Sequence, residues 1–548
     1  MRRFALILFP ALLPARGPTP GETLAAMKKA ATFYKDKVST HGGYHFTYTD
    51  DLSYGRSEHA ETPHHVEVQR EGTPRVGMAY LEAYDATGDK YFLEAARSVG
   101  HMLVKGQLCS GGWDYYTEFE PAERKRMPYR ADNNCSPANP RGKPVTNLDD
   151  NVTQACTRLI MRIDKALGFS DKAIHEAARF ALDSLVKAQY PIGAWPQRYS
   201  EFPDMAKFPV KKASYPASWP RKWPGDGYQT HYTFNDNSIA DAIDTMLEAA
   251  RVYNEPRYKA SAEKGGQFIL LAQMPDPQPA WAQQYDLDMH PAWARVFEPP
   301  SVTGGESQGI MRMLMVLYRE TGDKKYLEPI PRALAYLKKS ILPPPAKPSE
   351  VRRRVGLNTP TLARFFELQT NRPLYITKGM MLRARGVGAV GRPDGYELSY
   401  DDSSVITHYG VLVSGADLPN IEAEYQKVAA AAPATLRRPD KLHGLSPWSD
   451  RQRRPAVTAE AVAKLIQSMD ARGAWTQEGI IGKADRVVSV FAARDMVLMI
   501  NGKPTPIKEN DNIELFEGQQ PPRTRIIRSS TFAQHLESLA AWYAGSKR

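Results

Sequence analysis

The chain has 548 residues, of which 42% are apolar and 24% are charged. This composition predicts one large folded domain or two ordinary ones, and it excludes a chain that is disordered throughout. The 72 basic residues outnumber the 61 acidic ones and give a formal net charge of +11. That charge favours a polyanionic partner: a nucleic acid, an anionic membrane or an acidic polysaccharide. The short basic runs are typical of a solvated surface, so we expect no nucleic-acid partner.

The N-terminus has the layout of a secretory signal. Arg2 and Arg3 precede a mostly apolar stretch from Phe4 to Leu13, and small residues follow. This stretch is too short to cross a bilayer and no other stretch approaches a membrane span, so we expect no membrane partner. Residues 1–20 are therefore predicted to be a signal peptide, and the mature protein is predicted to be secreted or periplasmic.

Pairs of helical patterns recur from residue 25 to residue 345, and a loop with an aromatic residue follows most pairs. The aromatic markers Tyr44, Trp113, Trp195 and Trp281 are 69, 82 and 86 residues apart, which leaves room for two helices each time. A helix hairpin cannot bury its apolar stripe alone, so successive hairpins must stack. The predicted pairs are 75–87 with 88–106, 151–167 with 171–189, 237–253 with 257–273, and 307–320 with 322–340, while 25–38 resembles the second half of an earlier pair.

Stacked hairpins with a mixed-charge exterior favour a mainly α fold, an incomplete α/α toroid, over an open solenoid. We assign this toroid, the expected catalytic domain, to residues 21–375. After it, β-like stretches at 486–491 and 496–503 and a helical pattern at 531–544 predict a small sheet and a closing helix. Residues 376–548 are therefore expected to form a small α+β extension, to which the sequence assigns no role.

The cysteines bear on the fold as well. Three of them cannot all pair, so the fold cannot depend on a disulfide framework. Cys156 lies on an apolar helix face with Leu159 and Ile163 and is predicted to be a small core residue. Cys109 and Cys135 could bridge a loop in an exported protein, and the sequence leaves that pairing open.

Acidic residues stand at or near the start of the leading helix of each pair. Glu71 and Glu306 are explained as helix-cap or dipole partners. Asp149, Asp150 and Asp236 differ because asparagines flank them, and hard cations bind several such oxygens at once. Equivalent positions of neighbouring hairpins converge at one mouth of a toroid, so a shared calcium site is physically reasonable there.

Six ordered strings resemble the polysaccharide lyase family 10 pectate lyases, most strongly over residues 145–375. The strings are Leu148-Asp-Asp-Asn-Val-Thr153, Ala188-Gln-Tyr-Pro-Ile-Gly-Ala-Trp-Pro-Gln197, Thr233-Phe-Asn-Asp-Asn237, Trp281-Ala-Gln-Gln-Tyr-Asp286, Pro291-Ala-Trp-Ala-Arg-Val-Phe-Glu-Pro-Pro-Ser301 and Ala363-Arg-Phe-Phe-Glu-Leu-x-Thr-Asn-Arg-Pro373. The chain departs from the family pattern at Ala194, where a glycine is usual, and at Tyr285, where a histidine is usual.

The resemblance implies an α/α toroid and calcium-dependent β-elimination of polygalacturonate with an arginine as base. Carried onto this chain, the base is Arg295 and the acids of the calcium site are Asp149 and Asp236. The internal repeat equally allows Asp150 in place of Asp149, because Asp150 and Asp236 each lie 45 residues before the tryptophan of their own unit.

Four further residues are expected to bind substrate: Asn235, Arg364, Arg372 and Trp195. The two arginines either bind carboxylates of the polymer or form structural ion pairs, and Trp195 either supports a sugar ring or anchors the packing. The expected protein is a monomeric pectate lyase. Two alternatives remain: a glycoside hydrolase on the same toroid, which needs two carboxylates and leaves Arg295 without a role, and an inactive protein that binds acidic polysaccharide.

Overall fold

Short strands and long helices alternate along the chain, and the helices pack as hairpins. The computed structural model describes residues 17–547 apart from 134, 136–142, 226, 345–355, 357, 379–395, 401–411, 438–456, 482–486, 492–495, 501–502, 509–511 and 517–522. Almost all of the predicted signal segment therefore lies outside the described residues. The first helix begins at Pro20, at the end of that segment. Thr19 Oγ1 accepts a hydrogen bond from the Glu22 amide, and the Glu22 carboxylate accepts one from the Thr19 amide, which makes a capping box.

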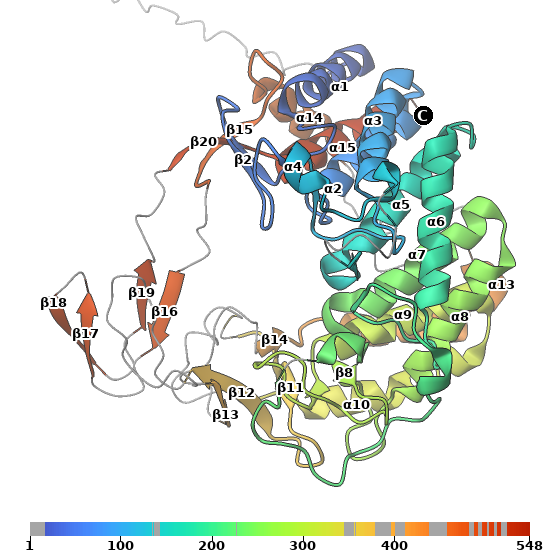
Figure 1. Cartoon of the computed structure of the whole chain (residues 1–548), viewed down its shortest axis with the longest axis vertical. Coiled ribbons are helices and arrows are strands. Elements are labelled where there is room, and N and C mark those ends of the chain that lie inside the picture. The colour runs from blue at the N-terminus through green and yellow to red at the C-terminus, as the bar shows by residue number, and fades with distance from the viewer. Residues whose placement is uncertain are drawn as a thin grey trace, which may run out of the picture.

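Each hairpin consists of a leading helix and a second helix that covers it. The leading helices α2 (Thr73–Thr87), α5 (Val152–Ala166), α7 (Ser238–Tyr253) and α9 (Glu306–Thr321) pack against one another in this order. Their second helices are α3 (Lys90–Gly106), α6 (Lys172–Ala188), α8 (Pro256–Leu271) and α10 (Ile330–Lys339). The hairpins follow an arc that stays open on one side (Figure 1). The predicted mainly α fold, an incomplete α/α toroid, is confirmed.

A tryptophan closes each of three hairpins in the same way. The indole Nε1 atoms of Trp113, Trp195 and Trp281 each donate to a carbonyl oxygen of the preceding second helix at 2.9 Å. The turn before Trp195 requires glycine, because Gly193 has φ +104° and a Cβ atom there would lie 2.0 Å from the Lys264 carbonyl oxygen. The aromatic markers of the repeat are therefore packing anchors at the ends of the hairpins.

Residues near the C-terminus complete the N-terminal end of the toroid, which corrects the predicted domain boundary at residue 375. Helix α15 (Ser529–Ser546) packs along α2 and along α1 (Pro20–Phe33). The N-terminal half-hairpin seen in the sequence thus receives its leading helix from the other end of the chain (Figure 1). The predicted closing helix is confirmed, but it belongs to the toroid and to its hydrophobic core rather than to a separate extension.

A second part of the C-terminal region repeats the tryptophan contact that closes the hairpins. Helix α14 (Ala459–Gln467) packs on α15 and α1, and Trp475 after it donates its Nε1 hydrogen to the Leu465 carbonyl at 2.9 Å. The tripeptide Gly473-Ala-Trp475 matches the Gly-Ala-Trp of the second full unit. At the other end of the arc, α12 (Leu418–Ala430) packs against α9 and α10. The described part of residues 376–548 therefore supplies helices to both ends of the arc.

Short antiparallel strands join the ends of each hairpin. Three pairs flank the full units: β3 (His65–Glu67) with β4 (Tyr116–Glu118), β5 (Thr146–Asn147) with β6 (Arg198–Tyr199), and β7 (Tyr232–Thr233) with β8 (Gln284–Tyr285). Two sheets have four strands each. The strand order of one is β15 (Thr476–Gly479), β20 (Thr524–Arg528), β1 (Thr47–Thr49), β2 (Gly55–Arg56). The order of the other is β13 (Tyr396–Ser399), β12 (Pro373–Lys378), β11 (Phe365–Phe366), β9 (Val302–Thr303). The remaining pairs are β10 (Thr361–Ala363) with β14 (Leu412–Ser414), β16 (Val487–Phe491) with β19 (Asn512–Phe516), and β17 (Met496–Ile500) with β18 (Lys503–Ile507).

Two of the three cysteines pair and the third is buried. Cys109 and Cys135 form a disulfide with their Cα atoms 5.3 Å apart, which answers the question that the sequence left open. Cys156 is fully buried on α5, as predicted for a small core residue. Among the helices of the described ranges, none combines the length and apolar character that a membrane span requires.

Candidate active site

Two turns of the same conformation begin the leading helices α5 and α7. Each contains a 3-10 turn, and two successive residues in each adopt positive φ: 49° and 58° at Asp150 and Asn151, 49° and 60° at Asp236 and Asn237. Asp and Asn tolerate this left-handed conformation better than other residues with a side chain, which explains why both turns end in Asp-Asn. Asp150 is therefore the structural equivalent of Asp236.

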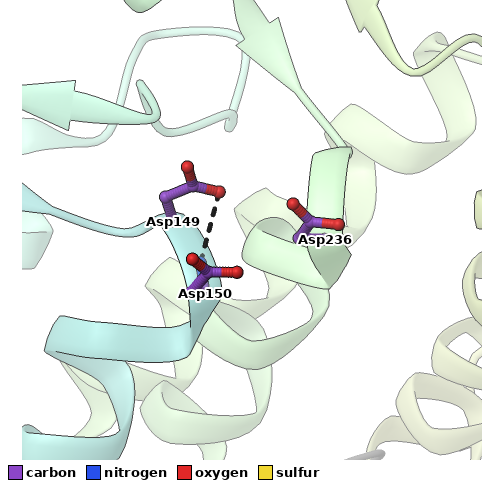
Figure 2. Close-up of side chains that lie close together, drawn as sticks. All are labelled: Asp149, Asp150 and Asp236. Carbon is purple, nitrogen blue, oxygen red and sulfur yellow. Dashed lines mark hydrogen bonds between the residues drawn. The ribbon is translucent and has the colours of Figure 1, made fainter. Parts of the chain in front are cut away.

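The residue before these aspartates differs between the turns. Asp149 occupies the position that Asn235 holds in the second turn. The family resemblance indicated Asp149 as a calcium ligand, whereas the internal repeat indicated Asp150. The structure brings both to the same place, since ligand oxygens of Asp149, Asp150 and Asp236 all lie within 4.8 Å of one another (Figure 2).

The electrostatics of these three carboxylates, which we call the aspartate cluster, favour a bound cation. Desolvation and the charge of Asp149 raise the pKa of Asp236 to about 7, although Arg364 acts in the opposite direction and 40% of the side chain is exposed. Desolvation and Asp149 also raise the pKa of Asp150. Calcium binds oxygens at about 2.3–2.6 Å, so that two of its ligands lie at most about 5 Å apart. The donor set and its spread therefore fit calcium.

Side chains from before the second full hairpin support the cluster. The Tyr115 hydroxyl lies 3.3 Å from Oδ2 of Asp149 and 3.3 Å from Oδ2 of Asp150. Gln69 donates its Nε2 hydrogen to the other side of the cluster, at 3.0 Å from Asp150 Oδ2. These hydrogen bonds hold the carboxylates in place, which is the usual task of groups behind metal ligands.

Arg295 lies beside the cluster in the loop between β8 and β9. Its Nε and Nη2 atoms donate to the two carboxylate oxygens of Glu298 at 2.9 and 2.7 Å, and its backbone amide donates to the same carboxylate. Burial lowers the pKa of Arg295, but Glu298 and Asp149 outweigh burial and leave this pKa above its ordinary value. The Glu298 side chain is 1% exposed, so it fixes the guanidinium from the protein side.

Arg364 and Asn235, the predicted substrate-binding residues, lie next to Asp236. Arg364 Nη2 is 2.9 Å from Glu306 Oε1 and 3.9 Å from Asp236 Oδ1. The Asn235 amide donates to Asp236 Oδ2 at 2.8 Å. Glu306, predicted to be a helix-cap or dipole partner, stands in the first turn of α9 and also forms an ion pair with Arg364.

Two other predicted residues lie elsewhere. Trp195 is 1% exposed and its indole donates to the Leu185 carbonyl, so the prediction that it binds sugar is wrong. Arg372 stacks over the Tyr400 ring at 3.4 Å, and among the described contacts none joins it to the aspartate cluster. The two departures from the family pattern, Ala194 and Tyr285, are both fully buried.

Sequence reasoning missed three residues of the site: Glu298, Tyr115 and Arg198. Glu298 stands three residues after Arg295 in the segment 291–301, and that short spacing is a signal that could have revealed the pair. Tyr115 comes two residues after a tryptophan anchor, and Arg198 directly follows one of the quoted strings. Nothing in the local sequence marks either of them, because their places depend on contacts between hairpins.

The chain is similar to several known proteins. The profile described as pectic acid lyase matches residues 123–398. A family 10 polysaccharide lyase from Cellvibrio cellulosa is 20% identical, with a TM-score of 0.41 over 65% of this chain and 97% of that chain. A mutant of that lyase in complex with trigalacturonic acid is 20% identical, with a TM-score of 0.41 over 65% and 98%. A family 76 α-mannanase from Bacteroides thetaiotaomicron is 10% identical, with a TM-score of 0.33 over 60% and 72%.

None of the curated protein sequences matches the chain. The solved structures score too low for any argument about activity to rest on them. The family profile, in contrast, covers about half of the chain and contains the aspartate cluster, Arg295 and Arg364. The chain belongs to the pectic acid lyase family and is a polysaccharide lyase.

Proposed function

We propose that the protein is a pectate lyase that cleaves polygalacturonate by calcium-assisted β-elimination, with Arg295 as the general base. The placement of Arg295 carries this proposal. Its guanidinium lies close enough to Asp149 and Asp150 for its charge to act on both carboxylates. A galacturonate carboxylate held at the aspartate cluster would therefore bring its sugar ring next to the arginine.

The chemistry requires both groups. The C5 proton of galacturonate is weakly acidic, because the adjacent C6 carboxylate opposes further negative charge. Calcium held by Asp149, Asp150 and Asp236 would supply positive charge that offsets the carboxylate. Arg295 accepts the C5 proton, the C5–H electrons form a C4–C5 double bond, and the C4–O bond to the next sugar breaks. The departing oxygen takes a proton from water.

The Glu298 ion pair has two consequences for this step. It holds the guanidinium in one orientation, which favours proton transfer by positioning. It also keeps Arg295 mostly protonated, so only a small neutral fraction can act as base. We therefore expect the elimination rate to rise about tenfold per pH unit toward alkaline pH.

The geometry does not favour the hydrolase alternative. Inverting glycosidases hold their two carboxyl groups about 6.5–9.5 Å apart and retaining ones about 5–5.5 Å apart. The three aspartates present ligand oxygens within 4.8 Å of one another, as a shared cation requires.

We extend the proposal to the location and state of the protein. The signal-like residues 1–20 and the Cys109–Cys135 disulfide both support export to an oxidising compartment, secreted or periplasmic. One chain supplies the aspartate cluster and Arg295 together, which supports a monomer as the active species.

Arg295→Lys tests the proposed base. Lysine keeps the positive charge but lacks the planar fork that Glu298 holds. We expect turnover of polygalacturonate, followed as ultraviolet absorbance of unsaturated product, to fall by at least about two orders of magnitude. Calcium binding should persist, because the cluster lies on other elements.

The possible outcomes separate the candidate functions. Elimination at near wild-type rates by Arg295→Lys would show that Arg295 is not the base. New reducing ends without unsaturated product from the wild type would indicate a hydrolase, and no product at all would indicate a binding protein. A chelator should abolish the wild-type signal and added calcium should restore it.

A further inference from the structure

Three arginines surround the aspartate cluster, and their charges are offset to different degrees. Arg295 is paired with the buried Glu298, and Arg364 is paired with the buried Glu306. Arg198 has no carboxylate partner among the described residues, and its contacts are with a tyrosine. Its charge is therefore the least compensated of the three.

The backbone directs Arg198 toward the site. Strand β6 contains only Arg198 and Tyr199, and Arg198 pairs across the ladder with Asn147, two residues before the aspartate cluster begins. Successive residues of a strand point to opposite faces. Tyr199 is 6% exposed and belongs to the hydrophobic core, so Arg198 points the other way and is half-buried.

Tyr115 links this arginine to the cluster. Arg198 Nη2 donates to the Tyr115 hydroxyl oxygen at 3.4 Å, and that hydroxyl is also 3.3 Å from both Asp149 and Asp150. The guanidinium is thus separated from the carboxylates by a single hydroxyl group. His59 stacks on the same tyrosine ring with the ring centres 3.9 Å apart, which supports the ring from behind.

Arg198 contacts a tyrosine, Tyr115, rather than a carboxylate. The Arg198 guanidinium lies 5.4 Å from the Tyr115 ring centre, within the range of a cation–π contact. Such a contact orients the arginine without cancelling its charge. An incoming carboxylate therefore gains a charge-assisted, bidentate hydrogen bond without first displacing a protein carboxylate. Arg295 and Arg364 would each have to share their donors with a glutamate.

We propose that Arg198 on its Tyr115 support is a subsite that binds the carboxylate of the galacturonate residue next to the one at the aspartate cluster. The subsite selects substrates in which that neighbouring carboxylate is free rather than methyl-esterified. This inference rests on the proposed pectate lyase function. Tyr115 and His59 lie before residue 123, so the subsite is completed by residues outside the part of the chain that matches the family profile.

The test compares Arg198→Gln and Arg198→Lys with the wild type on polygalacturonate and on partly methyl-esterified pectin. Loss of a charge-assisted contact should raise KM for polygalacturonate about ten- to hundredfold in Arg198→Gln with kcat little changed. Arg198→Lys should show a smaller rise, since it keeps the charge. The wild-type preference for polygalacturonate over the esterified pectin should shrink by a similar factor in Arg198→Gln.

Two controls isolate the subsite. Lys339→Gln removes one positive charge at the end of the outer helix α10 and should leave KM unchanged. The calcium concentration for half-maximal activity should be the same in Arg198→Gln and wild type, which excludes damage to the cluster. An unchanged KM, or an unchanged preference between the two substrates, would overturn the inference while the wild type still forms unsaturated product. Absence of that product from the wild type would instead overturn the proposed function.

Discussion

The two turns at the starts of α5 and α7 share a backbone but have different neighbours. Both present an aspartate at φ 49°, Asp150 in one and Asp236 in the other. The first turn adds a second carboxylate, Asp149, which faces Arg295 and Tyr115. The second turn has the neutral Asn235 at that position, which donates to Asp236.

The same turn conformation therefore occurs in two different surroundings. The shared aspartates come from neighbouring hairpins and meet because equivalent positions of stacked units lie side by side. The unshared position has different neighbours in the two turns: Asp149 lies near Arg295 and Tyr115, whereas Asn235 lies near Arg364. Repetition therefore brings the shared aspartates together, and the unshared position gives each turn different neighbours.

The largest effect should follow from removing the shared aspartates. Asp150→Ala and Asp236→Ala should each reduce turnover by at least about a hundredfold, because each removes one of the three anions that the described residues bring to the site. Calcium affinity, measured by titration calorimetry, should fall in both. Equal loss in the two variants would confirm that the turns are equivalent. Undiminished calcium affinity in both would rule out a shared site.

A smaller effect should follow from making the first turn like the second. Asp149→Asn keeps the shape of the side chain but removes one charge, so we expect calcium affinity to fall about tenfold with part of the activity retained. Alanine at the same position should be worse, since the oxygen donor is lost as well. If Asp149→Asn matched the wild type in calcium titrations, Asp149 would act on Arg295 rather than on the ion.

The stability of the calcium-free protein should depend on pH because the three carboxylates repel one another. The pKa of Asp236 is raised to about 7, whereas the pKa of an aspartate in an unfolded chain is about 3.9. The folded state therefore retains a proton that the unfolded state has lost, and stability should fall as pH rises between these two values. Thermal melts with a chelator should show this decline. Saturating calcium or Asp236→Asn should abolish it.

The smallest effect concerns the backbone of the turns. Asn151 and Asn237 have φ values of 58° and 60°, where alanine is strained by about 1–2 kcal/mol. We expect Asn151→Ala and Asn237→Ala to lower stability by about that amount in chemical denaturation, and glycine replacements to cost less. Unequal costs in the two variants would show that side-chain contacts outweigh the shared backbone.

Much of the architecture could be predicted because it is local. Helix periodicity recurs in every unit and a tryptophan follows three of the second helices, so the sequence predicted the stacked hairpins and the incomplete toroid. The Asp-Asp-Asn and Asn-Asp-Asn strings also indicated the aspartate cluster, because each offers several oxygen donors near the start of a leading helix. Arg295 was found through family resemblance rather than through spacing.

Other features depend on contacts that no local pattern encodes. Ser529 donates to the His45 carbonyl across 484 residues of sequence, as part of the packing by which α15 completes the first hairpin. Burial of Trp195, the Arg364–Glu306 pair and the support of Arg198 by Tyr115 likewise arise only when separate hairpins meet. The sequence by itself determined the units and the kinds of chemistry they carry. Tertiary packing decided which side chains lie beside the aspartate cluster, since burial and charge compensation depend on neighbours that are distant in the chain.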